Sequence, residues 1–291
     1  MEEIAPNIFL EDGFPGVVLS AIKLKNHLLM VDSPFRSEDI RLWRAKLAEL
    51  GSGLERTLVI LDAHIDRTLG LRAMESVVVG HDNTVEIIRE RPASARSQDL
   101  DAGAECEAYD LPSSIRWALP NMTYTKSMSI YFDEGPVVLK HRPGSNLACS
   151  WLQFDAEKLI FVGDSVMINQ PPFLAWADLD IWVKEVEELL SVDFRGYKII
   201  TSRNGVVRSK SIEKWLQYLT RVKDVVFNEA SGSGQVEDLL AIVPDLLKRL
   251  NFTRNLTELY ETRLKWGLAA YYRRHFLADD QLLKSDDSCK S

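Results

Sequence analysis

The sequence lacks any excess of basic residues. Its 43 Asp and Glu residues outnumber 35 Lys and Arg residues, which gives a formal net charge of −8 at pH 7. Nucleic acids and anionic membranes attract proteins through basic patches that displace counterions. We therefore expect neither a nucleic acid nor a membrane among the partners of this protein.

Cysteine is also scarce, since the chain contains only Cys106, Cys149 and Cys289. They match no CxxC spacing, and any disulfide scheme leaves one of them unpaired, which favours a reducing compartment. No stretch approaches the length of about 18 apolar residues that a membrane span needs. The first residues, Met-Glu-Glu-Ile-Ala-Pro, lack the basic and apolar regions of a signal peptide. We therefore expect a cytoplasmic protein.

Apolar runs of strand length alternate with segments of helical periodicity through residues 1–229. Two β-rich halves, each flanked by helices, predict an α/β fold built as a four-layer αββα sandwich. A loop or insertion is expected at 92–120, which is rich in Ala, Ser, Asp and Pro. The expected strands lie within 4–32, a β-meander, and at 57–61, 76–79, 122–162 and 198–200; the expected helices lie at 37–50, 69–75, 83–91, 176–190 and 209–228.

The C-terminal part of the chain differs in composition from the rest. Residues 230–234, Ala-Ser-Gly-Ser-Gly, are expected to be a linker, followed by a helical extension over 235–277 and a disordered tail over 278–291. The basic and aromatic residues at 265–275 are interpreted as an amphipathic helix that packs Trp266, Tyr271 and Tyr272 inward, rather than as a nucleic-acid patch.

Polar residues follow the expected strands at four places. The buried strand 57–61 leads into Asp-Ala-His-Ile-Asp-Arg at 62–67, and Pro-Gly-Ser stands at 143–145. Gly-Asp at 163–164 and Thr-Ser-Arg-Asn-Gly at 201–205 also follow apolar runs. With Phe-Pro-Gly at 14–16 and Leu-Met-Val-Asp-Ser at 29–33, their order and spacing resemble those of the metallo-β-lactamase superfamily. The resemblance covers residues 4 to about 228 and implies the fold of that superfamily.

The resemblance also implies where a site of two metal ions would lie. In that family a His-x-His-x-Asp-His turn, a histidine after Pro-Gly, a metal-bridging aspartate and a last histidine supply the ligands. Three of the seven positions, His64, Asp66 and Asp164, keep the family residue. The seven corresponding positions in this sequence are Asp62, His64, Asp66, Arg67, Ser145, Asp164 and Arg203.

Two of the substituted positions carry arginine, which cannot be a metal ligand. A guanidinium group stays protonated in proteins and has five hydrogen-bond donors but no free lone pair. If the fold brings Arg67 and Arg203 beside Asp66 and Asp164, two fixed positive charges replace a metal cation there. We therefore expect a metal-free cluster of salt bridges without dinuclear hydrolase activity. If the protein is instead a hydrolase, the candidate catalytic residues are Asp66, Asp164, Arg67 and Arg203.

Two functions remain open from the sequence. In the first, the protein is a pseudoenzyme without a cofactor that binds an unknown small molecule or protein in the former active-site cleft. The helical extension over 235–277 would then cover the cleft or form a homodimer contact. In the second, Asp62, His64 and Asp164 hold one divalent ion, zinc, manganese or iron, and the protein hydrolyses an ester, thioester, lactone or phosphoester.

Overall fold

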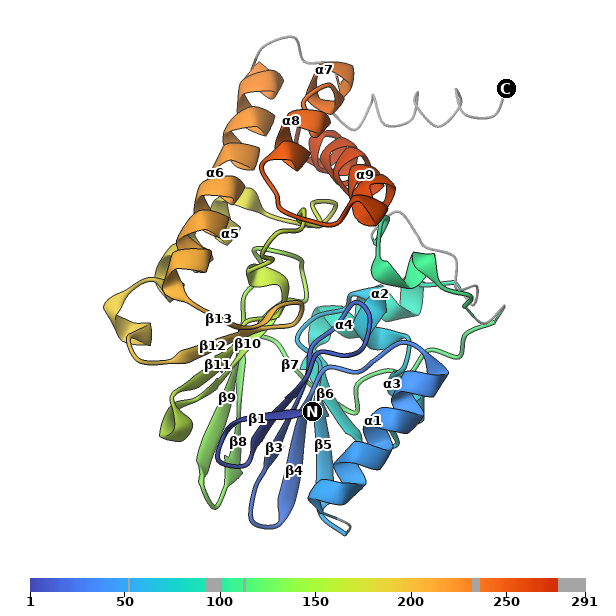
Figure 1. Cartoon of the computed structure of the whole chain (residues 1–291), viewed down its shortest axis with the longest axis vertical. Helices are drawn as coiled ribbons and strands as arrows, with labels where there is room; N and C mark the ends of the chain where they lie inside the picture. Colours follow the sequence, from blue (N-terminus) through green and yellow to red (C-terminus); the bar gives the residue numbers. More distant parts are fainter. Residues whose placement is uncertain (52, 93–100, 112–113, 232–235, 277–291) are drawn as a thin grey trace.

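Two β-sheets face each other in the computed structural model, which describes residues 1–51, 53–92, 101–111, 114–231 and 236–276 (Figure 1). The first sheet has the strand order β1-β2-β3-β4-β5-β6-β7. Its first four strands form the expected antiparallel meander, and β4 to β7 are parallel. The strands are β1 (Glu2–Ala5), β2 (Ile8–Glu11), β3 (Leu19–Lys23), β4 (His27–Val31), β5 (Glu55–Val59), β6 (Val77–His81) and β7 (Met122–Tyr124).

The second sheet has the order β13-β12-β11-β10-β9-β8, and β11 and β12 are its parallel pair. Its apolar inner face packs on the first sheet, since Leu139, Leu152 and Phe161 share a buried cluster with Ile8 and Leu29. This cluster is the centre of the sandwich. The strands are β8 (Ser127–Phe132), β9 (Gly135–His141), β10 (Ser150–Phe154), β11 (Leu159–Phe161), β12 (Lys198–Thr201) and β13 (Gly205–Val207).

Helices cover the outer faces of both sheets and complete the four layers. On the first sheet, Trp43 and Leu47 of α1 (Ser37–Leu50) pack in one cluster with strand residues Met30 and Leu58. Short helices α2 (Ile65–Thr68) and α3 (Leu71–Met74) and helix α4 (Asp82–Glu90) follow strands of the same sheet. On the second sheet, α5 (Leu179–Leu189) and α6 (Ser209–Ser231) pack on β10, β11 and β12. The four-layer αββα sandwich expected from the sequence is confirmed.

The helix expected at 69–75 is shorter in the structure, where α3 spans Leu71–Met74, and a separate short helix, α2, precedes Gly70. A Cβ atom on this glycine would lie 2.0 Å from the carbonyl oxygen of Pro34. The close approach of the chain after β4 explains why glycine stands here.

The C-terminal extension is helical and packs on the second sheet's outer layer. It contains α7 (Val236–Leu240), α8 (Val243–Lys248), a 3-10 turn at Arg254–Leu256, and α9 (Thr257–Phe276). Its apolar residues belong to the same buried cluster as α5 and α6. In Figure 1 these helices lie beside α6, at the end of the sandwich where α2 lies.

Some details of this region differ from the sequence-based expectation. Helix α6 continues to Ser231, so residues 230 and 231 are helical rather than part of a linker. Tyr271 and Tyr272 are buried as expected, but Trp266 is 39% exposed. Gly267 faces Leu174 at this point of α9, so the neighbouring Trp266 is turned away from the contact. Residues 232–234 of the expected linker and the expected tail at 278–291 lie outside the described residues.

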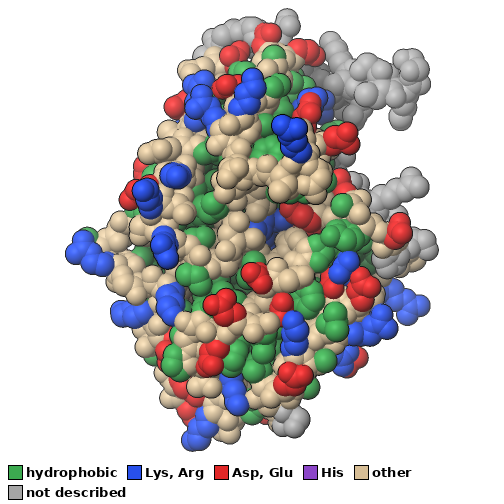
Figure 2. Space-filling model, in the orientation of Figure 1, with side chains coloured by type: hydrophobic (Ala, Val, Ile, Leu, Met, Phe, Trp, Pro, Cys, Tyr) green, Lys and Arg blue, Asp and Glu red, His purple; other side chains and the backbone are tan. Residues whose placement is uncertain are grey.

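The surface agrees with the mixed charge of the sequence. Figure 2 shows basic and acidic side chains interspersed over the face in view, rather than gathered by sign. None of the helices that the structure describes is long and apolar enough to cross a membrane.

Candidate functional site

The seven positions singled out from the sequence come from loops at one end of the sandwich. Asp62 to Arg67 follow β5 and enter α2, Ser145 lies between β9 and β10, Asp164 follows β11, and Arg203 follows β12. The polar residues that follow β5, β11 and β12 therefore lie at the carboxyl ends of these strands.

Arg67 is fully buried at the centre of this group, although a guanidinium group is rarely buried without partners. Its Nη1 donates to Asp62 Oδ2 and its Nη2 donates to Asp164 Oδ1. Its Nε lies 3.3 Å from Asp32 Oδ2. Three carboxylates from three separate loops thus surround one guanidinium.

The partners of Arg67 differ in part from the expected ones, because Asp66 is not among these carboxylates. Consecutive residues of a helix point about 100° apart, and Asp66 is turned toward the loop that follows residue 100. There it accepts hydrogen bonds from the backbone N–H of Cys106 at 2.9 Å and of Glu105 at 3.3 Å.

Arg203 joins the two carboxylates that the sequence placed beside it. Its Nε lies 3.0 Å from both oxygens of Asp164, and its Nη1 lies 3.3 Å from Asp66 Oδ2. The same Nη1 donates to Glu105 Oε2. The guanidinium also packs on the ring of Phe173, 4.9 Å from the ring centroid.

Burial and these charges change the protonation of the acidic groups. Burial raises the pKa of Asp164, but Arg203 and Arg67 outweigh that effect and hold it below its ordinary value. Burial and the nearby Glu105 carboxylate raise the pKa of Asp66 to about 8. Burial also raises the pKa of Asp32 to about 6, against the opposing charge of Arg67. At neutral pH, Asp164 is therefore ionised and Asp66 is mostly protonated.

His64 is a neutral imidazole in this cluster. Burial lowers its pKa well below the ordinary value, and the charges of Arg203 and Arg67 lower it further. Its Nδ1 accepts from the backbone N–H of Asp66 at 3.2 Å, so Nε2 carries the proton and lies 3.6 Å from Asp101 Oδ1. Asp101 is paired in turn with Arg91, whose Nη2 is 2.7 Å from Asp101 Oδ2.

Three further participants were not identified as site residues from the sequence. Asp32 ends an apolar strand, a signal that could have singled it out, and it accepts hydrogen bonds from Ser202 Oγ at 2.5 Å and Leu61 N at 3.0 Å. Glu105 lies in the segment that the sequence predicts to be a loop, and no motif or residue spacing in the sequence identifies it as a site residue. Arg263, from α9, donates Nη2 to Glu105 Oε1 at 2.9 Å.

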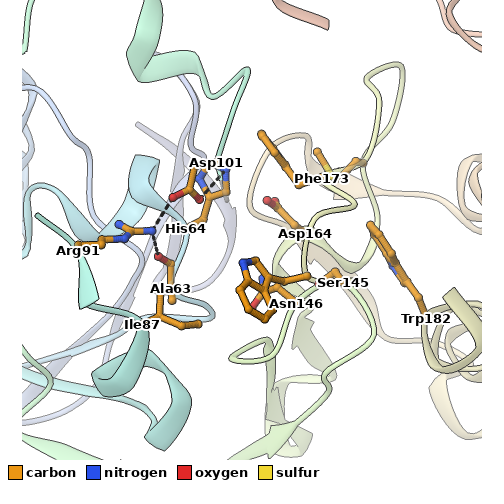
Figure 3. Close-up of a pocket in the computed structure, with 12 residues that line it drawn as sticks. Ala63, His64, Ile87, Arg91, Asp101, Ser145, Asn146, Asp164, Phe173 and Trp182 are labelled. Atoms are coloured by element: carbon orange, nitrogen blue, oxygen red, sulfur yellow. Dashed lines mark hydrogen bonds and ion pairs between the residues drawn. The ribbon is translucent and has the colours of Figure 1, made fainter. Parts of the chain in front are cut away.

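A pocket lies beside this cluster, between the two halves of the sandwich (Figure 3). Its enclosed cavity has a volume of about 40 Å³ and opens into a larger concavity that solvent fills. His64, Asp101 and Arg91 lie on one side of it, and Ser145, Asp164, Phe173 and Trp182 lie on the other. The cleft that the resemblance predicts is therefore present, and His64 and Asp164, which contact the buried arginines, lie in its wall.

The residues at the seven positions singled out from the sequence do not fit a divalent ion. Asp62 and Asp164 both accept from Arg67, and the Nδ1 lone pair of His64 accepts from a backbone N–H. In residues 1–51, 53–92, 101–111, 114–231 and 236–276, no group of three or more His, Cys, Asp or Glu side chains is placed to hold a metal ion. The donor atoms that a metal would need are engaged by protein donors.

Comparison with known proteins identifies the fold. No protein-family model and no curated protein sequence matches the chain. Among solved structures, a double mutant of a sec-alkyl sulfatase is 13% identical with a TM-score of 0.65; the alignment covers 98% of this chain and 51% of that chain, so the chain spans about half of the sulfatase.

Two other solved structures align with this chain over nearly the whole of their own length. A metallo-β-lactamase family protein from Thermus thermophilus is 14% identical with a TM-score of 0.65, over 94% of each chain. A metallo-β-lactamase from Pontibacter korlensis is 14% identical with a TM-score of 0.57, over 75% of this chain and 97% of that chain. At such identities the similarity concerns the fold alone, which is that of the metallo-β-lactamases, as expected from the sequence.

Proposed function

We propose, from the premise that this chain has the metallo-β-lactamase fold, that it works without a metal ion and binds a small molecule or a protein in the former active-site cleft. The observation that carries the proposal is Arg67, a fully buried guanidinium held by Asp62, Asp164 and Asp32. In this proposal, the carboxylates that would otherwise need a metal cation are neutralised by arginine.

Electrostatics support this interpretation. A divalent ion bound to Asp62 and Asp164 would lie roughly 4 Å from the guanidinium that bonds both carboxylates, and the repulsion would be about 8 kcal/mol at an effective dielectric constant of about 20. Arg67 cannot lose its proton to relieve this repulsion, because the neighbouring carboxylates raise its pKa still further above the ordinary value. Metal binding would therefore require Arg67 to leave the cluster.

The environment of Arg67 opposes such a movement. The side chain is 0% exposed, so a displaced guanidinium would need another buried partner or a path to solvent. Breaking a buried ion pair typically costs about 3–5 kcal/mol. The cluster is thus a fixed structure behind the wall of the pocket, which it reaches through Asp164.

Metal content tests the proposal. The protein is purified without chelators, its metal is measured by inductively coupled plasma mass spectrometry, and it is then titrated with zinc, manganese and iron. A quadruple variant with histidine restored at the substituted positions, Asp62→His, Arg67→His, Ser145→His and Arg203→His, serves as the matched comparison. We expect far less than one ion per chain and no tight binding in the parent, and metal uptake in the variant if it folds.

One tightly held ion per parent chain would overturn the metal-free proposal. It would favour the alternative of a mononuclear hydrolase, with Asp62, His64 and Asp164 as the ligands to be tested next. The metal analysis and the titration of the parent alone decide the question even if the quadruple variant does not fold.

A further inference from the structure

The charged groups that line the pocket are already paired within the protein. Asp164 accepts from Arg67 and Arg203, and Asp101 accepts from Arg91. Arg91 also donates to Thr68 Oγ1 at 2.8 Å and to the carbonyl of Ala63 at 2.7 Å. A charged ligand would therefore find its natural partners engaged, and it would lose its own hydration on entering.

Two neutral polar groups on the pocket wall remain without a partner. Ser145 Oγ and Trp176 Nε1 are buried and have no hydrogen-bond partner among the residues that the structure describes. Ser145 is only 3% exposed. The polar group beside it is the Cys149 thiol, which forms only weak hydrogen bonds. A buried polar group without a partner costs about 1–3 kcal/mol, so a ligand atom that satisfies it gains affinity.

The contrast between two tryptophans of this pocket is informative. Trp182 donates Nε1 to the carbonyl of Ser165 at 2.8 Å, whereas Trp176 leaves the same donor unused. An indole N–H can only donate, so its partner on a ligand must be an acceptor such as a carbonyl oxygen. The Trp176 ring itself is packed against the Arg274 guanidinium, at 5.4 Å from the centroid, which fixes one of its faces.

Besides the polar residues His64 and Asn146, the remainder of the wall is apolar. Ile87, Met167, Phe173 and Trp182 line the pocket beside these groups. Phe173 already packs against the guanidinium groups of Arg263, at 4.0 Å, and Arg203, so the aromatic face that would attract a ligand cation is occupied.

We infer that the pocket takes an uncharged small molecule with an apolar ring and a carbonyl-type acceptor that accepts from Trp176 Nε1. The inference rests on the proposed function and names the class of ligand for its cleft. Ions of either sign are disfavoured because the charged groups of the pocket are already paired. Purely apolar rings are disfavoured because they would leave the buried donors unsatisfied.

Four probes of nearly equal shape test the inference: benzamide, benzoate, benzylammonium and toluene. Each is titrated into ¹⁵N-labelled full-length protein, and the indole N–H signals are followed by nuclear magnetic resonance. The Trp176 signal is assigned with Trp176→Phe, which keeps an aromatic ring and removes the donor. Trp266→Phe, on the exposed side of α9, is the matched control.

We expect benzamide to shift the Trp176 signal and to bind at least about 5-fold more tightly than any other probe. Loss of one neutral hydrogen bond corresponds to about 3- to 10-fold in affinity, so Trp176→Phe should weaken benzamide by that factor and leave toluene nearly unchanged. Ser145→Ala provides a second variant if Trp176→Phe does not fold. Trp266→Phe should bind all four probes as the parent does.

Preferred binding of benzoate or benzylammonium at Trp176 would overturn the ligand class while leaving cleft binding, and so the proposed function, intact. If no probe shifts the Trp176 signal at millimolar concentration, the inference is wrong. The metal-free part of the proposed function is judged separately by metal content.

Discussion

Arg203 Nε lies 3.0 Å from both carboxylate oxygens of Asp164, while Arg67 holds one of those oxygens from the other side. In the family that the sequence resembles, the aspartate at this position bridges two metal ions. Here the same carboxylate bridges two guanidinium groups. The network continues through Glu105, which accepts from both Arg203 and Arg263.

Replacing Arg67 tests whether the cluster stabilises the fold. Arg67→Ala leaves Asp62, Asp164 and Asp32 without their shared cation in a site that water does not reach. We expect the free energy of unfolding to fall by about 3–5 kcal/mol, measured by urea denaturation.

The matched control for this variant is Arg89→Ala. Arg89 forms an exposed ion pair with Glu86, with both side chains at least 60% exposed, and such pairs contribute at most about 1 kcal/mol. A parent-like stability of Arg67→Ala would show that the buried ion pairs do not stabilise this fold.

Arg263 connects the C-terminal extension to the cluster. It is 1% exposed and donates to the carbonyl of Gly103 at 3.0 and 2.8 Å as well as to Glu105. We expect Arg263→Ala to increase amide hydrogen exchange most strongly in α9 and in residues 101–111. Arg273→Ala, an exposed position on the same helix, should leave exchange in both regions as in the parent. Unchanged exchange in residues 101–111 of Arg263→Ala would contradict this coupling.

Stability should depend on pH in the neutral range. The pKa of Asp66 is raised to about 8 in the folded protein, from an ordinary value of 3.8. The folded state therefore binds a proton that the unfolded state has lost, so the contribution of Asp66 to stability falls as pH rises from about 5 to 8. Below about pH 6.5 the lowered pKa of His64 acts in the opposite direction, so the fall is expected from about pH 6.5 to 8. One such proton gives a slope of at most about 1.4 kcal/mol per pH unit. Urea denaturation at pH 5, 6, 7, 8 and 9 measures it.

Asp66→Asn mimics the protonated carboxyl and should make this decline shallower. Burial also raises the pKa of Glu185 to about 8, so Glu185→Gln should remove a second part of the slope in the same direction. If the free energy of unfolding of Asp66→Asn falls with pH as steeply as that of the parent, the proton does not reside on Asp66.

Gly144 sets the position of the Ser145 loop against α5. A Cβ atom there would lie 2.4 Å from Glu185 Oε2 and 2.5 Å from Trp182 Cα, and the second neighbour is backbone. Gly144→Ala should therefore move the loop, lower stability by about 1–3 kcal/mol and weaken benzamide binding at the pocket. At Gly13 the nearest atom to a new Cβ is the end of the Glu11 side chain, so Gly13→Ala should cost less. Equal stability losses in the two variants would argue against a steric role for Gly144.

The sequence by itself determined the layers of the fold and the identity of the substituted positions. Strand and helix periodicity are local properties, so the meander, the buried strand before Asp62 and the two β-rich halves could be predicted without coordinates. The chemistry of arginine is equally local. No arrangement of the chain can make a ligand of Arg67 or Arg203, whatever surrounds them.

Only the tertiary structure decided which charges meet. Arg67 and Asp164 are 97 residues apart in the sequence, and Arg263 and Glu105 are 158 apart. A rotation of about 100° between neighbours on one helical turn sends Arg67 to Asp62 and Asp164 and sends Asp66 to the loop with Glu105. The unpartnered indole of Trp176 has the same origin, because the packing of distant segments determines which donors find a partner.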